Sequence, residues 1–384
     1  MMNSSHYDVI IVGAGPAGLS TALHLAHVAP SLAERILLLE AATHPRRKVC
    51  GGAITFHGAE QLRQLGLDMD VPAAVVHNVA FRFGHHEFTT ESQNTMHIIQ
   101  REAFDASLAS EVCSKGIEIR GGERLGDLRP VSQGIELTTN KGVYQASVVV
   151  GADGSNSVVR QKLGIRSTMG VARLLRAMTP VDEQTTPAFT HHTAVFDFTC
   201  MQQGVQGYIW DFPCFVDGQA FLNRGIFDSR IASRPRGDLK AAFATALTER
   251  GIAWDSIKLE GHPVRWFNPR SVFARPRVLL AGDAAGVDPL FAEGISYAME
   301  YGAIAASTIV EAFSQKEFTF ADYRNRILRH DLGHMLLTKV RIAKMLYRLP
   351  FPRICSLLWR FAELAPPAFN RRIGAMLGVF SLKG

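Results

Sequence analysis

The chain of 384 residues has only five cysteines and contains no CxxC pair. The odd count and the missing pair argue against a disulfide framework or a structural zinc site, and they favour a reducing compartment such as the cytoplasm. The adjacent pairs His85-His86 and His191-His192 are poor shared metal ligands, because neighbours on a strand point to opposite faces. We therefore expect a cytoplasmic protein without a metal site.

The chain also lacks a positively charged start followed by an apolar segment, so we expect no signal peptide. One long stretch without a formally charged residue, Val9 to Ala33, has the length of a membrane span. Three glycines and a proline lie in its first half. They predict a strand, a turn and a helix in place of a transmembrane helix.

Acidic residues are scarce near one end. Between Asp331 and Gly384 there are nine Lys or Arg and two Asp or Glu, a balance of +7, so a total of +6 leaves about −1 for residues 1–330. Apolar patterns at Met335 to Leu349 and Ile354 to Leu364 predict two helices with basic faces. Such helices favour either peripheral contact with an anionic membrane or a solvated protein surface, and nothing favours nucleic acid.

The first sixty residues contain a nucleotide-binding pattern. The apolar run Tyr7 to Val12, the turn Gly13-Ala14-Gly15-Pro16-Ala17-Gly18 and the Ala- and Leu-rich Leu19 to His27 predict a strand, a turn and a helix. The three glycines allow a tight turn, close approach of a pyrophosphate and packing of helix on strand, and the helix N-terminus attracts phosphate. A second strand, Arg35 to Leu39, ends in Glu40, an acid suited to ribose hydroxyls.

Two further strands run into turns that carry an aspartate. Val148 to Val150 leads into Gly151-Ala152-Asp153-Gly154, and Val278 to Leu280 leads into Ala281-Gly282-Asp283. Pro289, Gly294 and Ile295 follow the second turn and open a helix. Ligands of open α/β sheets lie at the carboxyl ends of strands, where an aspartate can bond a ribityl hydroxyl.

Together these three motifs resemble the signatures of the p-hydroxybenzoate hydroxylase-like FAD superfamily, over about Tyr7 to Ala312. The segment Gln100 to Leu108 resembles that superfamily's R-x-x-F-D-x-x-L segment, whose arginine, here Arg101, contacts FAD. The resemblance implies an α/β fold with a Rossmann-like FAD-binding domain, an inserted antiparallel β-sheet substrate domain and a C-terminal helical tail. No second GxGxxG follows a strand, so we expect no separate NAD(P) domain. NAD(P)H acting transiently, or another reductase protein, would supply the electrons.

Strand-like alternation gives the expected boundaries. Residues 79–83 and 86–90 predict a hairpin around Gly84, and His191 to Phe198, Gly207 to Phe212 and Gln219 to Phe227 predict an antiparallel sheet. We expect the FAD-binding domain to comprise residues 1–78, 91–165 and 272–325. The substrate domain would comprise residues 79–90 and 166–271, and the helical C-terminal region residues 326–384.

Three shorter segments resemble geranylgeranyl reductases more narrowly. Arg47 to Ile54 is similar to their K-x-C-G-G-A/G segment, Tyr208 to Pro213 to Y-x-W-x-F-P, and Ala292 to Ala298 to G-E-G-I-x-x-A. In that family the first two segments border the place where a polyprenyl chain meets the flavin. This chain departs twice, since Ala292 replaces a glycine and Cys214 stands where lysine commonly follows the proline.

The candidate site residues follow from these motifs and resemblances. The catalytic candidates are Cys50, Tyr208 and Trp210, and the substrate pocket would be walled by Tyr208, Trp210 and Phe212, which share one face of a strand. Cys50 is alternatively a small buried apolar side chain, and the three aromatic residues are alternatively sheet core. The cofactor-binding candidates are Gly13, Gly15, Pro16, Ala17, Gly18, Glu40, Lys48, Cys50, Gly51, Gly52, Ala53, Arg101, Leu125, Asp153, Gly154, Gly282, Asp283, Pro289, Gly294 and Ile295.

The leading hypothesis is an FAD-dependent oxidoreductase that resembles geranylgeranyl reductases and reduces carbon–carbon double bonds of an isoprenoid or other apolar substrate. One alternative is an FAD-dependent monooxygenase, a hydroxylase or halogenase, acting on an aromatic substrate that is free or attached to a carrier or peptide. Another alternative is an FAD-bound maturation or interaction partner with little turnover.

Overall fold

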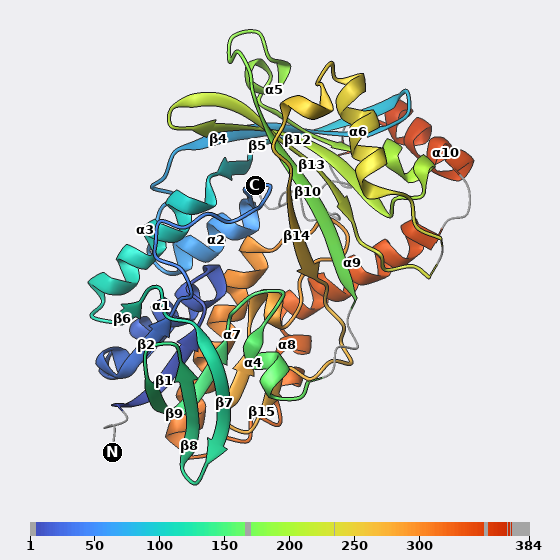
Figure 1. Ribbon diagram of the computed structural model, residues 1–384. Helices are drawn as coiled ribbons and strands as arrows, with labels where there is room; N and C mark the ends of the chain where they lie inside the picture. Colours follow the sequence, from blue (N-terminus) through green and yellow to red (C-terminus); the bar gives the residue numbers. More distant parts are fainter. Residues whose placement is uncertain are drawn as a thin grey trace.

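The computed structural model of the protein describes residues 5–165, 170–233, 235–348, 352–366, 368 and 370. The chain forms two lobes, each built on an eight-stranded sheet, and helices from the last part of the described chain run along the side of both (Figure 1). The mixed α/β architecture predicted from the sequence is confirmed.

The first sheet is mainly parallel and belongs to the lower lobe in Figure 1. Its strands are β1 (Ser5–Val12), β2 (Ile36–Leu39), β6 (Glu118–Arg120), β7 (Leu125–Val131), β8 (Gly134–Thr139), β9 (Val143–Gly151), β15 (Ala274–Arg275) and β16 (Val278–Leu280). β1 pairs in parallel with β2 and β9, and β9 pairs in parallel with β16. Their carboxyl ends therefore meet at one edge, where the three predicted turns come together.

The second sheet forms the upper lobe. Its strands are β3 (Ala53–Thr55), β4 (Ala73–Phe83), β5 (His86–Ile99), β10 (Val171–Pro180), β11 (Thr193–Asp197), β12 (Gly207–Val216), β13 (Gln219–Asp228) and β14 (Glu260–Arg265). β12 pairs antiparallel with β11 and with β13, as expected. β10 and β14, which were not predicted as strands, extend the sheet with antiparallel pairing, and β11 also runs parallel to β4. No tight hairpin connects β4 to β11, so no turn forces their direction. The β4–β5 hairpin is longer than predicted, because the polar residues after Glu91 hide the alternation of β5.

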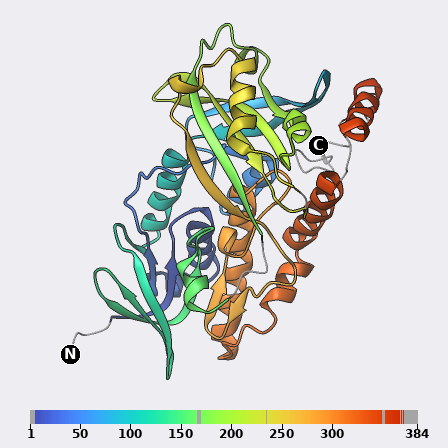
Figure 2. The same cartoon turned by 45° about the vertical axis from the view of Figure 1, so that its right-hand side comes forward.

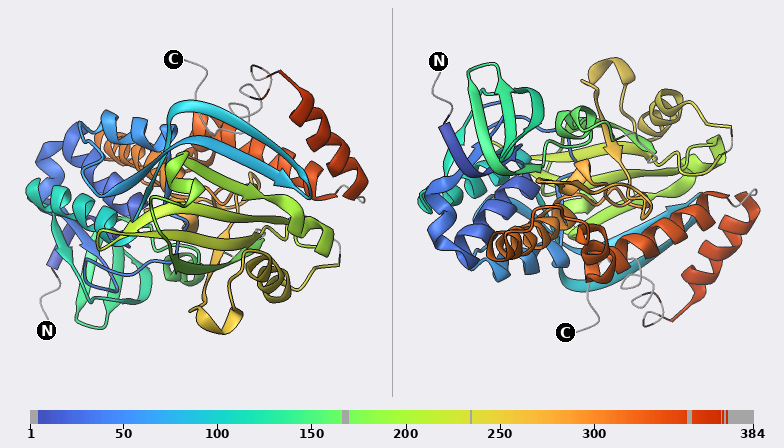
Figure 3. Two further views of the ribbon diagram at one scale, coloured as in Figure 1. Left: turned by 90° about the horizontal axis from the view of Figure 1, so that it is seen from above. Right: turned by 90° about the horizontal axis from the view of Figure 1, so that it is seen from below.

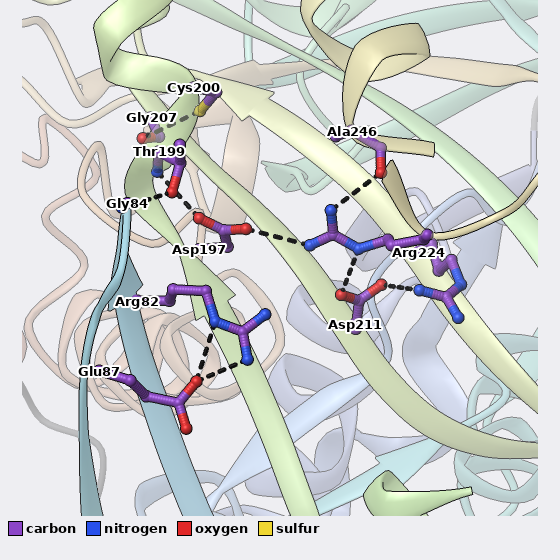
Figure 4. A network of polar contacts seen from close by, with 11 residues as sticks. Arg82, Gly84, Glu87, Asp197, Thr199, Cys200, Gly207, Asp211, Arg224 and Ala246 are labelled. Atoms are coloured by element: carbon purple, nitrogen blue, oxygen red, sulfur yellow. Dashed lines mark hydrogen bonds and ion pairs between the residues drawn. The ribbon is translucent and has the colours of Figure 1, made fainter. Parts of the chain in front are cut away.

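The two faces of the second sheet have different partners. Helix α6 (Leu239–Glu249) covers one face, where Arg250 donates to Asp211 at 2.8 Å and to Asp197 at 3.1 Å. Arg224 donates to Asp211 at 2.5 Å, so the network joins β11, β12 and β13 (Figure 4). The residues that alternate with Asp211 on β12, Trp210 and Phe212, point to the other face, toward the first lobe.

Helix α7 (Ile295–Gln315) begins after Gly294, as predicted, and packs against α1 (Pro16–Val28). After it, α8 (Tyr323–Arg329), α9 (Asp331–Arg348) and α10 (Pro352–Leu364) run along the side of the molecule (Figure 2). Both predicted C-terminal helices are confirmed, and Leu349, the expected last residue of the first one, lies outside the described residues. The other helices are α2 (Phe56–Gln64), α3 (Arg101–Ser114), α4 (Val158–Lys162) and α5 (Pro187–Thr190).

α10 lies against β4 and β5, at the end of the molecule remote from β1 (Figure 3). Among the described residues, every helix is too short or too polar to cross a bilayer.

Candidate cofactor and substrate site

The glycine-rich turn after β1 has the geometry that a phosphate-binding loop needs. Gly13 has φ +103°, and a Cβ there would lie 2.4 Å from the Ala152 carbonyl oxygen; a Cβ on Gly18 would lie 1.9 Å from the Gly13 carbonyl oxygen. A Cβ added to Gly15 would have its nearest neighbouring atom at 3.4 Å. Gly13 and Gly18 are therefore required by the turn and the helix packing, whereas Gly15 leaves the N-terminus of α1 open to a ligand.

Glu40, at the end of β2, joins this loop. Its carboxylate accepts from the Ala14 amide at 2.9 Å and the Ala42 amide at 3.1 Å, and Arg46 lies 3.2 Å away. The side chain is buried at the wall of a cavity. Each carboxylate oxygen retains a further lone pair for a ribose hydroxyl.

Two arginines meet above Gly15. An added Cβ on Gly15 would lie 3.4 Å from Nη2 of Arg46 and 4.0 Å from Nη2 of Arg101. Arg101 donates to Asp105 at 2.8 and 2.7 Å, and Arg46 lies 3.3 Å from the same carboxylate. Burial opposes the charge of Arg101, but Asp105 and the nearby Cys50 outweigh it and raise the pKa of Arg101. Two held cations at a helix N-terminus suit a pyrophosphate.

Arg46 was not among the predicted site residues. Its signal in the sequence was the basic run Arg46-Arg47-Lys48 shortly after Glu40.

The loop that carries Cys50 is fixed by its backbone. Gly52 has φ +80°, and a Cβ on it would lie 2.2 Å from the Ile99 carbonyl oxygen, so only glycine fits. The Gly52 amide donates to the Cys50 sulfur at 3.3 Å. Gly51 lies against β12, since its added Cβ would be 3.3 Å from the Phe212 ring.

Side chains of the second sheet hold the same loop from the other side. Asn223 on β13 donates to the carbonyl oxygens of Cys50 and Gly51 at 2.9 and 3.0 Å. The Trp210 indole N–H donates to the Asn223 amide oxygen at 3.1 Å. Arg176 on β10 also donates to the Cys50 carbonyl, at 3.2 Å. The Trp210 N–H thus orients the residue that positions the Cys50 loop.

The two predicted aspartates line the cavity from the strand ends of the first sheet. Asp153 uses Oδ2 to accept from the Val158 and Val159 amides at 2.6 and 3.1 Å, and burial raises its pKa. Its Oδ1 is buried and has no hydrogen-bond partner among the described residues. Asp283 accepts from the Ser155 hydroxyl at 2.8 Å. The orphaned Oδ1 is a group that a bound hydroxyl would satisfy.

Lys48 and His262 form a polar pair on the cavity wall. The Lys48 Nζ lies 2.7 Å from Nε2 of His262, which belongs to β14. Burial lowers the pKa of Lys48, and burial together with the Lys48 charge lowers the pKa of His262 to about 4. A neutral imidazole therefore accepts from the ammonium. His262 was not predicted, because no motif surrounds it in the sequence.

One cavity of about 520 Å³ connects these groups with an aromatic chamber. The Tyr208 hydroxyl donates to the Phe291 carbonyl oxygen at 2.5 Å, and burial raises the pKa of Tyr208 well above its usual value. The glycine-rich turn and the Cys50 loop line the same cavity as the aromatic chamber. A cofactor bound at these loops would therefore lie next to a ligand in the chamber. The rings that line the chamber are Phe196, Tyr208, Trp210, Phe212, Phe227 and Phe291.

Most of the predicted cofactor-binding residues line this cavity, including Leu125, Gly154 and Ile295. Gly18, Gly282 and Pro289 lie outside the lining. Gly18 and Gly282 serve packing instead, since a Cβ on Gly282 would lie 2.7 Å from the Ala17 Cβ.

Comparison with known proteins relates the chain to flavoproteins. The sequence profile of a family described as "FAD binding domain" matches residues 6–316. The chain is 28% identical to a menaquinone reductase of Mycolicibacterium smegmatis, over 78% of this chain and 75% of the relative. It is 24% identical to a digeranylgeranylglycerophospholipid reductase of Methanococcus vannielii, over 82% and 79%.

Two solved structures share the fold. A geranylgeranyl bacteriochlorophyll reductase-like protein from Thermoplasma acidophilum superposes with a TM-score of 0.82 at 20% identity, over 99% of this chain and 97% of that one. The halogenase PltM in complex with phloroglucinol and FAD superposes with a TM-score of 0.68 at 19% identity, over 89% and 76%.

The profile match spans most of the chain and decides the family. The chain belongs to the FAD-binding domain family. The cofactor of this FAD-binding protein is FAD, and the residues fit it. Arg46, Arg101 and the open N-terminus of α1 would hold the pyrophosphate, and Glu40 the ribose. The orphaned Asp153 Oδ1 would accept from a cofactor hydroxyl. The predicted FAD superfamily and fold are confirmed. The predicted resemblance to geranylgeranyl reductases is confirmed as well.

Proposed function

We propose that this FAD-binding protein is a reductase that saturates carbon–carbon double bonds in the isoprenoid chain of a lipid or quinone. The observation that carries the proposal is the single cavity that joins the cofactor loops to an aromatic chamber. Reduced FAD, when bound, supplies a hydride to one carbon of the double bond. A proton must reach the other carbon.

The polar atoms of the chamber wall are already engaged, which favours an apolar substrate. The Tyr208 hydroxyl donates to the Phe291 carbonyl, and the Trp210 N–H donates to Asn223. The wall therefore presents ring faces and edges, which bind an apolar chain and exclude water. The names of the menaquinone and digeranylgeranylglycerophospholipid reductases support the same substrate class.

Among the predicted catalytic residues, Cys50 is the best proton donor. It lines the cavity, and its loop is held by Gly52, Asn223 and Arg176. Tyr208 is a poorer donor, because its proton is committed to the Phe291 carbonyl and its pKa is raised by burial. Trp210 acts through Asn223 as a positioning residue. NAD(P)H, or another reductase protein, would reduce the flavin before each turnover.

The test is an anaerobic mixing experiment. Enzyme with chemically reduced flavin is mixed with a short-chain prenylated quinone or a geranylgeranyl lipid, and the absorbance of oxidised flavin is followed. We expect reoxidation and a product that has gained two hydrogens per double bond. Failure of every isoprenoid to reoxidise the flavin, with the enzyme fully loaded, would contradict the proposal.

A second candidate is an FAD-dependent monooxygenase, a hydroxylase or halogenase. The aromatic wall that suits a prenyl chain could also stack on a ring, and the halogenase PltM has the same fold. This activity requires oxygen, so it predicts no turnover in the anaerobic experiment and a hydroxylated or halogenated product in air. A flavin that no donor reduces would favour the third reading, a maturation partner with little turnover.

A further inference from the structure

Helix α10 carries apolar side chains on two faces, one buried and one exposed among the described residues. Its buried residues are Cys355, Trp359 and Ala362, at a spacing of four and three residues. A second apolar stripe follows on the outside, and each of its side chains is at least 40% exposed. The spacing corresponds to one helical face. The stripe consists of Ile354, Leu357, Leu358 and Leu364.

The packed face of α10 lies directly behind the aromatic chamber. The Trp359 ring is 5.3 Å from the Phe198 ring, and Phe198 is 5.6 Å from Tyr208 and 6.4 Å from Phe291, which both line the chamber. His86 of β5 also lies 2.8 Å from Glu363. These contacts fix α10 to the second sheet, so the outer stripe is presented in one orientation.

Basic residues outnumber acidic ones on α9 and α10, where the acidic residues are Asp331, the first residue of α9, and Glu363, which pairs with His86. The region from Asp331 to the end of the chain carries +7, although the rest of the chain is nearly neutral. Arg360 is exposed on α10, and Arg341 and Arg348 are exposed on α9. Exposed leucines flanked by arginines complement a surface with an apolar interior and anionic head groups, and each basic residue at such a surface adds to binding.

Helix α9 connects this surface with the cavity. Lys339 on its inner face lines the cavity and lies 3.6 Å from Asp288 and 4.7 Å from the Phe291 ring centre. Two residues later, Arg341 is exposed on the outer side of the same helix.

We propose that α10 and the outer face of α9 form a docking surface for an anionic lipid membrane. The helix would lie in the plane of the membrane, because no described helix is long and apolar enough to span it. The leucines of the stripe would enter the lipid and the arginines would contact the head groups. That this docking delivers a lipid substrate rests on the proposed function; the docking itself does not.

The experiment is cosedimentation of the full-length, FAD-loaded protein with vesicles. Vesicles of phosphatidylcholine alone are compared with vesicles containing phosphatidylglycerol, without any substrate. We expect binding to the anionic vesicles only. The triple variant Leu357→Ser, Leu358→Ser, Leu364→Ser should lower the partition coefficient at least about tenfold. The variant Arg341→Gln, Arg348→Gln, Arg360→Gln should weaken binding and reduce its dependence on salt.

The matched control changes exposed apolar residues elsewhere. Val28 and Phe56 are 53% and 38% exposed, so Val28→Ser with Phe56→Ser should leave vesicle binding unchanged. Flavin content and melting temperature establish that every variant is folded.

Several outcomes would overturn the proposal: no binding of the wild type to either vesicle, equal binding by the leucine variant, or a dimer in solution that this variant abolishes. A failed vesicle assay would leave the anaerobic reoxidation by a short-chain substrate unaffected, so the two proposals fail separately.

Discussion

The Asn223 side-chain amide lies 2.9 Å from the Cys50 carbonyl oxygen, although the two residues are 173 positions apart in the chain. Asn223 belongs to the second sheet and Cys50 to a loop of the first lobe, so this bond joins the two lobes at the cavity. Asn223→Ala removes the donor of the Gly51 carbonyl oxygen and the acceptor of the buried Trp210 N–H, whereas the Cys50 carbonyl oxygen keeps Arg176. We expect a loss of about 1–3 kcal/mol in stability and a rise of about tenfold in the Kd for FAD.

Isothermal titration of the flavin-free protein with FAD measures this change. Asn78→Ala is the matched control, because Asn78 also donates to a carbonyl, that of His191, but at an exposed position of the same sheet. If both variants bound FAD as tightly as the wild type, Asn223 would have no role in positioning the Cys50 loop.

Gly15 separates the two uses of glycine in the phosphate loop. Its φ is −93°, which any residue adopts, and an added Cβ has its nearest neighbour at 3.4 Å. Gly15→Ala should therefore fold normally. The methyl group would nonetheless stand where a pyrophosphate approaches α1, so we expect the purified protein to lose most of its FAD. The ratio of flavin to protein absorbance measures the loss.

Gly66→Ala provides the converse control. Gly66 has φ +70° with no atom within 4 Å of an added Cβ, so this change should lower stability by about 1 kcal/mol and leave FAD content unchanged. Full FAD content in Gly15→Ala would contradict the assignment of the loop.

The cofactor loops could be predicted from the sequence because each is short and contiguous. Gly13 to Gly18 and Glu40 follow strands whose apolar runs are unmistakable, and the positive φ values of Gly13 and Gly52 explain why those positions are glycine. The contacts between lobes could not be predicted. Asn223, Arg176 and His262 reach the site from strands far along the chain, and only the registers of β10, β13 and β14 bring them to it.

The pair Lys48 and His262 should influence the bound flavin electrostatically. Lys48 is a buried cation on the cavity wall, and within the described part of the chain no carboxylate lies within ion-pairing distance of it. A cation stabilises the negative charge that a flavin gains on reduction. Lys48→Met should lower the flavin midpoint potential by about 20–40 mV, equivalent to roughly 1–2 kcal/mol for two electrons.

Redox titration against a dye of known potential measures the shift. Arg47→Met is the control, because Arg47 is half exposed and pairs with Glu260. Equal potentials for Lys48→Met and the wild type would show that the ammonium does not act on the flavin.

Glu300 on α7 predicts a pH dependence of stability. It lies 2.7 Å from His57 and 2.9 Å from His330, and so links α7 to α2 and to the start of α9. Burial opposes its charge, but the hydrogen bonds from His330 and His57 outweigh burial and lower the pKa of Glu300. Burial lowers the pKa of His57, but Glu300 outweighs it and the net shift is upward; the hydrogen bond to Glu300 raises the pKa of His330.

The sign of the effect follows from these directions. A histidine whose pKa is raised in the folded protein makes its full contribution to stability at pH values below 6.5, the pKa of an unfolded histidine. That contribution is lost as the pH rises through the folded-state pKa. A glutamate whose pKa is lowered in the folded protein makes its full contribution to stability at pH values above 4.5, the pKa of an unfolded glutamate. That contribution is lost as the pH falls through the folded-state pKa. The cluster of Glu300, His57 and His330 therefore contributes most to the stability of the fold between pH values of about 4.5 and 6.5.

Between pH values of about 6 and about 9, the melting temperature of the wild type should fall more steeply than that of Glu300→Gln. The exposed change Glu249→Gln should keep the wild-type slope, and parallel slopes for Glu300→Gln and the wild type would rule out this linkage.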